Sequence, residues 1–154
     1  MKTRTARTKA GLVASAMMLA GMGTTLVTAT PAAAASWCNS YNISSKGFIE
    51  WAGEAQIPVY KSSSTTTRNC QMSVGSNGSH VKALQKTLNK CYGRSLDVDG
   101  DFGSLTRSAL IHAQKKAFPK DSSQWDGIYG PNTRDALLWY YKPVTPGYDE
   151  CSML

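Results

Sequence analysis

Three aspartates have the spacing of a possible metal-binding loop. Asp97, Asp99 and Asp101 alternate along the chain, as the carboxylate ligands of a calcium-binding loop do. A loop of that class also needs Gly at its sixth position and Glu at its twelfth, whereas Phe102 and Ser108 stand there. The pattern therefore favours a structural turn, and we expect neither a metal ion nor another cofactor.

The residues that hydrolases use for catalysis are sparse. Zinc hydrolases hold their metal with clustered His and acidic ligands, but the two histidines, His80 and His112, are far apart in the sequence. A serine nucleophile often lies in a Gly-x-Ser-x-Gly elbow, and no such motif occurs. The sequence therefore predicts a protein that is not an enzyme.

The cysteines indicate disulfides instead. Cys38, Cys70, Cys91 and Cys151 make an even number without the close C-x-x-C spacing of zinc and redox sites, and an even count is typical of disulfides in an exported chain. Four cysteines permit three pairings, among which sequence alone does not choose. We favour Cys38 with Cys70 and Cys91 with Cys151, because that pairing ties each half of the chain separately.

The amino-terminal segment explains why the chain would be oxidised. Basic residues at the start are followed by an apolar run, Ala10 to Val27, and by small residues ending at Ala35, which is the order of a secretory signal peptide. We assign residues 1–35 to that signal and expect no membrane span after processing. The protein is then secreted, and either extracellular or associated with a cell wall.

The net charge gives little reason to expect a nucleic-acid partner. The signal holds four of the 17 basic residues and none of the 10 acidic ones, so its removal lowers the formal charge from +7 to +3. The remaining Lys and Arg residues are scattered rather than clustered. A chain of this kind attracts anionic polymers only weakly.

A twelve-residue motif occurs twice. The segment that starts at Asp99 recurs at Asp126, and the copies agree at Asp, Gly, an aromatic residue, Gly, Thr, Arg, Ala and Leu. Such agreement at one fixed offset indicates a duplication. Glycines permit positive φ in a turn, and Thr near a helix start can bond the cap. We therefore expect each copy to be a structural turn that leads into a helix, formed by Asp99, Gly100, Gly103 and Thr106 and by Asp126, Gly127, Gly130 and Thr133.

Apolar spacing predicts three helices around these turns. The first is expected over residues 79–91, with Ser79 as its N-cap. The second ends at Pro119, and the third begins at Pro131, carries Tyr140 inward and stops before Pro143. Residues 57–60 and 70–74 flank a polar run and predict a β-hairpin, although residues 62–67 fit a disordered linker equally well.

The helix residues and the two turns together resemble the peptidoglycan-binding domain 1 family. The resemblance rests on Val81-Lys82-Ala83-Leu84-Gln85, on Leu88-Asn89 and on the repeated motif. It implies a three-helix domain of the kind that attaches secreted wall-active enzymes to bacterial cell walls. We therefore expect a mainly α fold with an internal repeat, made of the signal (1–35), a small β-hairpin extension (36–73), the peptidoglycan-binding-like domain (74–142) and a C-terminal tail tied by a disulfide (143–154).

Aromatic and charged residues near the turns are the candidates for ligand binding. Aromatic rings could stack on sugar faces, and arginines could pair with carboxylates of the stem peptide. The alternatives are core packing for the rings, above all for the repeated aromatic residues, and solvated helix positions for the arginines. The predicted ligand-binding residues are Tyr92, Asp101, Arg107, Trp125, Tyr129 and Arg134.

These observations predict a secreted, non-catalytic module that binds bacterial cell-wall peptidoglycan. Two other functions stay open. The chain could be an accessory or inhibitor protein that binds a secreted partner enzyme through residues 36–73, or a cell-wall hydrolase with an unrecognised site.

Overall fold

The structure is a computed structural model that describes residues 35–47, 52–143 and 149–154. The described residues all fall in one compact unit, Ala33–Leu154. The predicted signal peptide lies outside them, apart from Ala35. Within the described part, no helix combines the length and the apolar character that crossing a membrane requires.

Two helices form close to where the apolar spacing predicts them. Helix α1 (Ser79–Tyr92) buries Val81, Leu84 and Leu88 along one face and ends where Gly93 takes a left-handed conformation. Its N-cap is Gly78 rather than the predicted Ser79. Helix α2 (Ser104–Ala117) ends before Pro119, and a short 3₁₀ helix, η1 (Ser122–Gln124), follows it.

The prediction of a mainly α fold is wrong, because strands hold about as many residues as the helices. The fold is mixed α/β. A five-stranded antiparallel sheet contains β2 (Ser40–Gly47), β3 (Ala52–Lys61), β6 (Trp139–Pro143) and β7 (Glu150–Ser152) in that order, and β4 (Thr66–Thr67) also pairs with β3. A second, parallel sheet joins β1 (Ser36–Trp37) to β5 (Cys70–Gln71).

The predicted hairpin is correct in its first strand and wrong in its second. Residues 57–60 belong to β3, as predicted. The strand that pairs with β3 after the polar run is β4, whereas residues 70 and 71 form β5, which pairs with β1. The longer hairpin, β2 with β3, was missed. The residues of β2 are mostly exposed and none is buried. They form a strand because they pair with β3, and no alternation of buried apolar residues marks them in the sequence.

The predicted third helix is too long. Helix α3 (Pro131–Ala136) begins at the predicted proline, but Leu137 is extended and residues 139–143 form β6. Leu137, Trp139 and Tyr141 are buried while the residues between them are not. Tyr140 consequently points away from the core, contrary to the prediction. The strand forms because it pairs with both β3 and β7.

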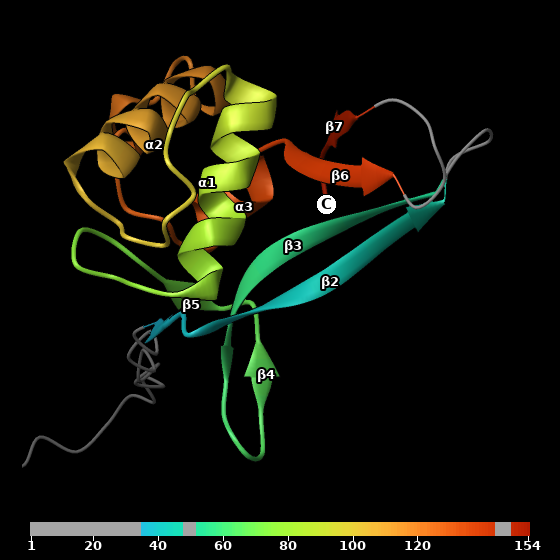
Figure 1. The fold of residues 1–154 in the computed structure, drawn as a ribbon. Helices are drawn as coiled ribbons and strands as arrows, with labels where there is room; N and C mark the ends of the chain where they lie inside the picture. Colours follow the sequence, from blue (N-terminus) through green and yellow to red (C-terminus); the bar gives the residue numbers. More distant parts are fainter. Residues whose placement is uncertain (1–34, 48–51, 144–148) are drawn as a thin grey trace, which may run out of the picture. The chain divides into compact units, whose positions relative to one another are not determined.

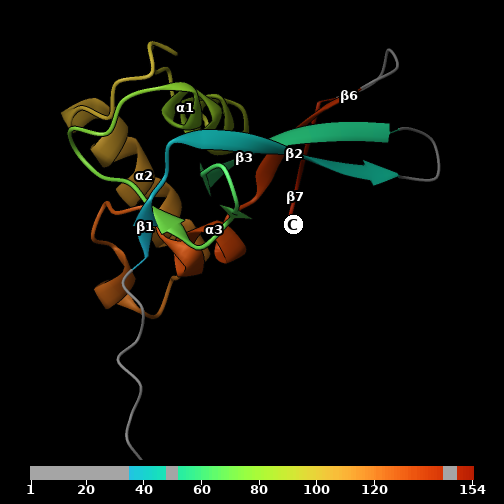
Figure 2. The same ribbon diagram turned by 90° about the horizontal axis from the view of Figure 1, so that it is seen from below.

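Both halves of the chain share one core. Helix α1 packs on β3, α2 packs against α1, and the outer ends of β2 and β3 extend away from the helices in both views (Figures 1 and 2). Ile57, Leu84, Leu110 and Trp139 are fully buried in the same cluster. Disulfides join Cys38 to Cys70 and Cys91 to Cys151, which is the pairing favoured from the sequence.

Candidate functional site

A buried glutamine organises the first repeated turn. Nε2 of Gln85 on α1 donates to Oδ1 of Asp99 at 2.8 Å, to the Asp101 carbonyl at 3.1 Å and to Oγ1 of Thr106 at 3.2 Å. Its Oε1 accepts from the Gly100 N–H at 3.0 Å. The Thr106 hydroxyl donates to the Asp101 carbonyl, not to the N-cap glycine as predicted. One side chain thus fixes the whole turn.

Gln114 on α2 does the same for the second turn. Its Nε2 donates to Oδ1 of Asp126 at 2.8 Å, to the Ile128 carbonyl at 3.0 Å and to Oγ1 of Thr133 at 3.2 Å. Its Oε1 accepts from the Gly127 N–H at 2.9 Å. Sequence reasoning missed this role for both glutamines. The available signal was that each lies on the helix that precedes a copy of the motif.

The aspartate of the first turn is held as a carboxylate. Oδ1 of Asp99 accepts from the backbone N–H of Asp101 at 2.8 Å and from Gln85. These hydrogen bonds, the first above all, hold the pKa of Asp99 below its usual value, because they stabilise the charged form. The role of Asp99 in the structure is therefore to close the turn.

The glycines of the motif do not all need special backbone geometry. Gly100 and Gly127 have φ of 89° and 71°, values that L side chains rarely adopt. Gly103 and Gly130 are extended, with φ of −88° and −145°. They are the N-caps of α2 and α3, so only the first glycine of each copy uses the positive φ that glycine permits.

Replacing Gly127 by alanine should therefore lower the free energy of unfolding by about 1 to 2 kcal/mol, because of its positive φ. A Cβ there would also lie 2.6 Å from Cγ of Arg107. Gly130→Ala is the matched control: nothing lies within 4 Å of its added Cβ, so its effect should be smaller than that of Gly127→Ala and confined to the weaker N-cap, within about 1 kcal/mol. Urea unfolding of both variants measures the difference, and equal losses would contradict this account.

A hollow lies at each turn–helix junction. The first has a volume of about 200 Å³ and is lined by Asp101, Gly103 and Thr106 among others. The second, of about 190 Å³, is lined by the matching Gly130 and Thr133. The duplication therefore produces two similar hollows. Of the six predicted ligand-binding residues, Asp101 alone lines one of them, and its carboxylate also accepts a hydrogen bond from the Asn77 amide.

The two predicted arginines contact the protein itself. Arg134 donates to both carboxylate oxygens of Asp135, at 2.7 and 2.8 Å, and to the Arg68 carbonyl at 2.6 Å. Nη2 of Arg107 donates to the Asp126 carbonyl at 3.0 Å, but its side chain is otherwise exposed. Arg107 is thus the more accessible of the two to an anionic ligand.

The predicted aromatic residues are less accessible than expected. Tyr92 and Tyr129 are buried, which favours the alternative of core packing: the Tyr92 hydroxyl accepts from the Leu138 N–H, and Tyr129 packs edge-on against Trp139. Trp125 is half-buried. Its Nε1 donates to the Phe118 carbonyl at 3.0 Å, and Nζ of Lys115 lies 5.4 Å from its ring centroid.

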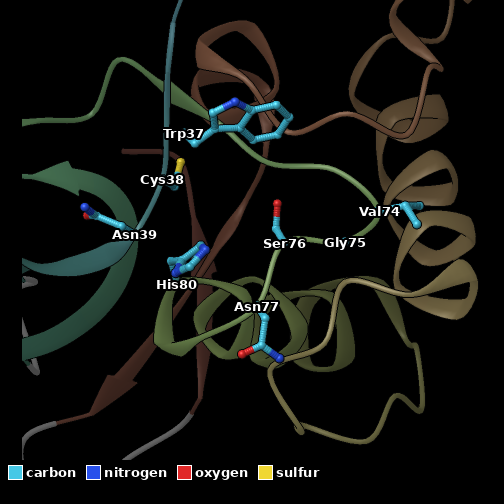
Figure 3. Close-up of a pocket in the computed structure, with 8 residues that line it drawn as sticks. All are labelled: Trp37, Cys38, Asn39, Val74, Gly75, Ser76, Asn77 and His80. Atoms are coloured by element: carbon cyan, nitrogen blue, oxygen red, sulfur yellow. The ribbon is translucent and has the colours of Figure 1, made fainter.

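A larger pocket lies where the N-terminal extension meets the start of α1 (Figure 3). Its volume is about 470 Å³, and its lining includes Trp37, Cys38, Ser76, Asn77 and His80. The indole of Trp37 is 57% exposed, whereas His80 is 4% exposed. Sequence reasoning missed this pocket, since Trp37 lies outside the repeat.

The segment before α1 is tied to both repeated turns. The Phe102 N–H donates to the Ser76 carbonyl at 2.9 Å, and the Gly75 N–H donates to the Phe102 carbonyl at 3.0 Å. Met72 and Tyr129 exchange two backbone hydrogen bonds of 2.9 Å. The pocket beside Ser76 is therefore built on the same framework as the turns.

Together these features define a disulfide-bonded α/β domain built on two glutamine-anchored turns, each leading into a helix. Residues 77–137 match the family model described as "Putative peptidoglycan binding domain". The match confirms the resemblance that the motifs of this segment indicated.

A longer protein shares a wider segment. The chain is 38% identical over 91 residues to the protein named "Probable N-acetylmuramoyl-L-alanine amidase" of Bacillus licheniformis. The match covers 55% of this chain and 24% of that relative, so the chain spans about a quarter of the relative's length. No solved structure matches the chain.

Proposed function

We propose that the protein is a secreted, non-catalytic module that binds bacterial cell-wall peptidoglycan. The observation that carries the proposal is the family match over residues 77–137. Within this segment, each of the two turns donates a backbone N–H to a buried glutamine, Gly100 to Gln85 and Gly127 to Gln114. The matched relative is named as an amidase of N-acetylmuramoyl-L-alanine, which is consistent with a wall-binding role for the shared segment.

The two disulfides support a location outside the cytoplasm. Two disulfides link all four cysteines, and such bonds persist in oxidising surroundings outside the cytoplasm. A peptidoglycan-binding domain with disulfides fits an extracytoplasmic, cell-wall context. We further propose that a signal peptide at residues 1–35 directs the protein to secretion.

The placement of the reactive groups supports a binding rather than a catalytic role. His80 lies at the pocket, where burial lowers its pKa, and His112 lies on α2 near Lys115 and Lys116. In the part of the chain that the structure describes, no three His, Cys, Asp or Glu residues come together as metal ligands would. We therefore propose that the module recognises the wall without cleaving it.

The mature chain should sediment with purified peptidoglycan sacculi, with half-saturation on the order of micromolar, or about −8 kcal/mol. Cellulose particles are the control for unspecific adsorption to an insoluble polysaccharide. The same protein should leave no cleared zone in a gel that contains sacculi. Protein that stays in the supernatant would refute wall binding, and a cleared zone would refute the non-catalytic assignment.

One observation favours the alternative of an accessory protein that binds a partner enzyme through residues 36–73. Strand β2 is the edge of its sheet and exposes Tyr41 and Ile43, and an edge strand offers unpaired backbone groups to another chain. The sedimentation experiment distinguishes the two functions, because a protein that binds only an enzyme stays in the supernatant of sacculi.

A further inference from the structure

The pocket beside Trp37 is rigidly built from two separate segments. Strand β1 brings Trp37 and pairs it with Gln71 of β5. The Cys38–Cys70 disulfide fixes the same place, and the Cys38 N–H donates to the Gln71 carbonyl at 2.9 Å. A Trp side chain held in this way loses little conformational entropy when a ligand covers it.

Three side chains of this pocket, those of Trp37, Ser76 and His80, face the same cavity. Figure 3 shows the indole of Trp37 on one side and the Ser76 hydroxyl and the His80 imidazole on the other. The Ser76 oxygen accepts from the Ser73 N–H at 3.2 Å, which leaves its own proton free to be donated. The pocket therefore combines one broad apolar face with polar groups opposite.

His80 supplies the second indication of a ligand. It is 4% exposed, yet its Nδ1 has no hydrogen-bond partner. A buried polar atom without a partner is rare in native proteins, since leaving it unpaired costs about 1 to 3 kcal/mol. Burial lowers the pKa of His80, so the uncharged imidazole is the favoured form in the wall of the pocket.

The lining selects against charged ligands. Its residues are Trp37, Cys38, Asn39, Val74, Gly75, Ser76, Asn77 and His80, and none is an acid, a lysine or an arginine. Moving a charged group from water into a site without an opposite charge is unfavourable. The charged stem peptide of peptidoglycan is therefore a poor occupant. The N-acetylated sugars of the glycan strand carry no charge of their own, and each has an apolar ring face.

We propose that this pocket binds a neutral N-acetylated sugar unit of the glycan strand, with its ring face on the Trp37 indole and its polar groups toward Ser76 and His80. The proposal rests on the proposed function and extends it, because Trp37 lies outside the segment 77–137 that matches the family. The volume of about 470 Å³ lies in the range of sites for small ligands.

Titration of the mature protein with a soluble tetramer of N-acetylglucosamine, followed by the indole N–H signals in NMR, tests the pocket directly. The Trp37 signal should shift, and Trp37→Ala should weaken both this binding and sedimentation with sacculi about tenfold, as loss of one stacked ring does. Tyr41→Ala, which removes another exposed aromatic side chain from β2, is the matched control and should change either affinity less than twofold. Cellotetraose, which lacks the acetamido groups, should bind at least about tenfold more weakly than the N-acetylated tetramer.

The two proposals fail in different ways. If the wild-type protein sediments with sacculi but Trp37→Ala does so equally well and the tetramer moves no indole signal, the pocket assignment is overturned and the proposed function stands. If the wild type does not sediment with sacculi, the proposed function is overturned. Equal binding of cellotetraose would overturn the assignment of an N-acetylated sugar.

Discussion

A protein in which Cys91 and Cys151 are both replaced by serine should lose about 4 kcal/mol of unfolding free energy. The bond links the end of α1 to β7 over a sequence separation of 60 residues, and the chain-entropy model gives about this value for a loop of that length. Strand β7 holds few residues and pairs with β6. We therefore expect its amides to exchange with deuterium first in the variant.

Urea unfolding of the oxidised wild type and the double variant measures this loss. Peptide mapping without reduction provides the accompanying control, since it should recover Cys91 joined to Cys151 and Cys38 joined to Cys70. A peptide that joins Cys38 to Cys91 or to Cys151 would show that the connectivity is different. A double variant as stable as the wild type would show that the bond contributes nothing.

Gln114→Leu should lower the free energy of unfolding by about 3 kcal/mol or more. The side chain is fully buried, and it satisfies the Gly127 N–H, the Ile128 carbonyl, Thr133 and Asp126 at once. Leucine fills a similar volume but leaves these polar groups without their partner, and each buried group left unpaired costs about 1 to 3 kcal/mol. Thermal or urea unfolding measures the loss.

Two further variants make the result specific. Gln85→Leu should cost about as much as Gln114→Leu, because Gln85 makes the matching bonds in the first turn. Gln124→Leu should change stability by less than about 0.5 kcal/mol, since that amide makes only exposed contacts, a long one of 3.5 Å with the Ser123 hydroxyl and one with the Asp121 carboxylate. Equal effects of Gln114→Leu and Gln124→Leu would show that the network does not stabilise the turn.

The sequence predicted those elements whose signals are local. Val81, Leu84 and Leu88 specify α1 by their spacing, and Pro119 and Pro131 mark helix ends because proline restricts its own backbone and that of its neighbour. The fixed offset between the two motifs identified both turns and the family. Which glycine of each turn takes positive φ could not be read from spacing, because Gly100 and Gly103 are equally compatible with a turn.

The strands depended on distant partners and were mostly missed. Tyr140 fits a helical face that includes Thr133 and Leu137, but Leu137, Trp139 and Tyr141 also alternate as a strand does. The chain after α3 follows the second pattern because β3 and β7 lie on either side of it. No local feature of those residues decides between the two periods.

The candidate site also depends on contacts between residues that are distant in the sequence. The motif located the turns and favoured core packing for Tyr129, but it did not indicate that Arg134 pairs with Asp135. Trp37 carries no periodic signal at all. Its place beside Ser76 and His80 results from the β1–β5 pairing and the Cys38–Cys70 bond, which join segments far apart in the sequence.

The pairing of β3 with β6 also constrains how the protein folds. Gly53 lies opposite Pro143, 90 positions later, so this part of the sheet has a high contact order, and closing so long a loop slows folding relative to a helical bundle of equal size. Helices α1 and α2 and the turn between them involve nearby residues, so we expect them to form early. Strand β3 can pair with β2 and β4 beforehand, but its edge at Gly53 and Glu54 gains a partner only when β6 docks. That open edge could pair with another chain in the meantime, so we expect the docking of β6 to be the step at which this protein is most exposed to aggregation.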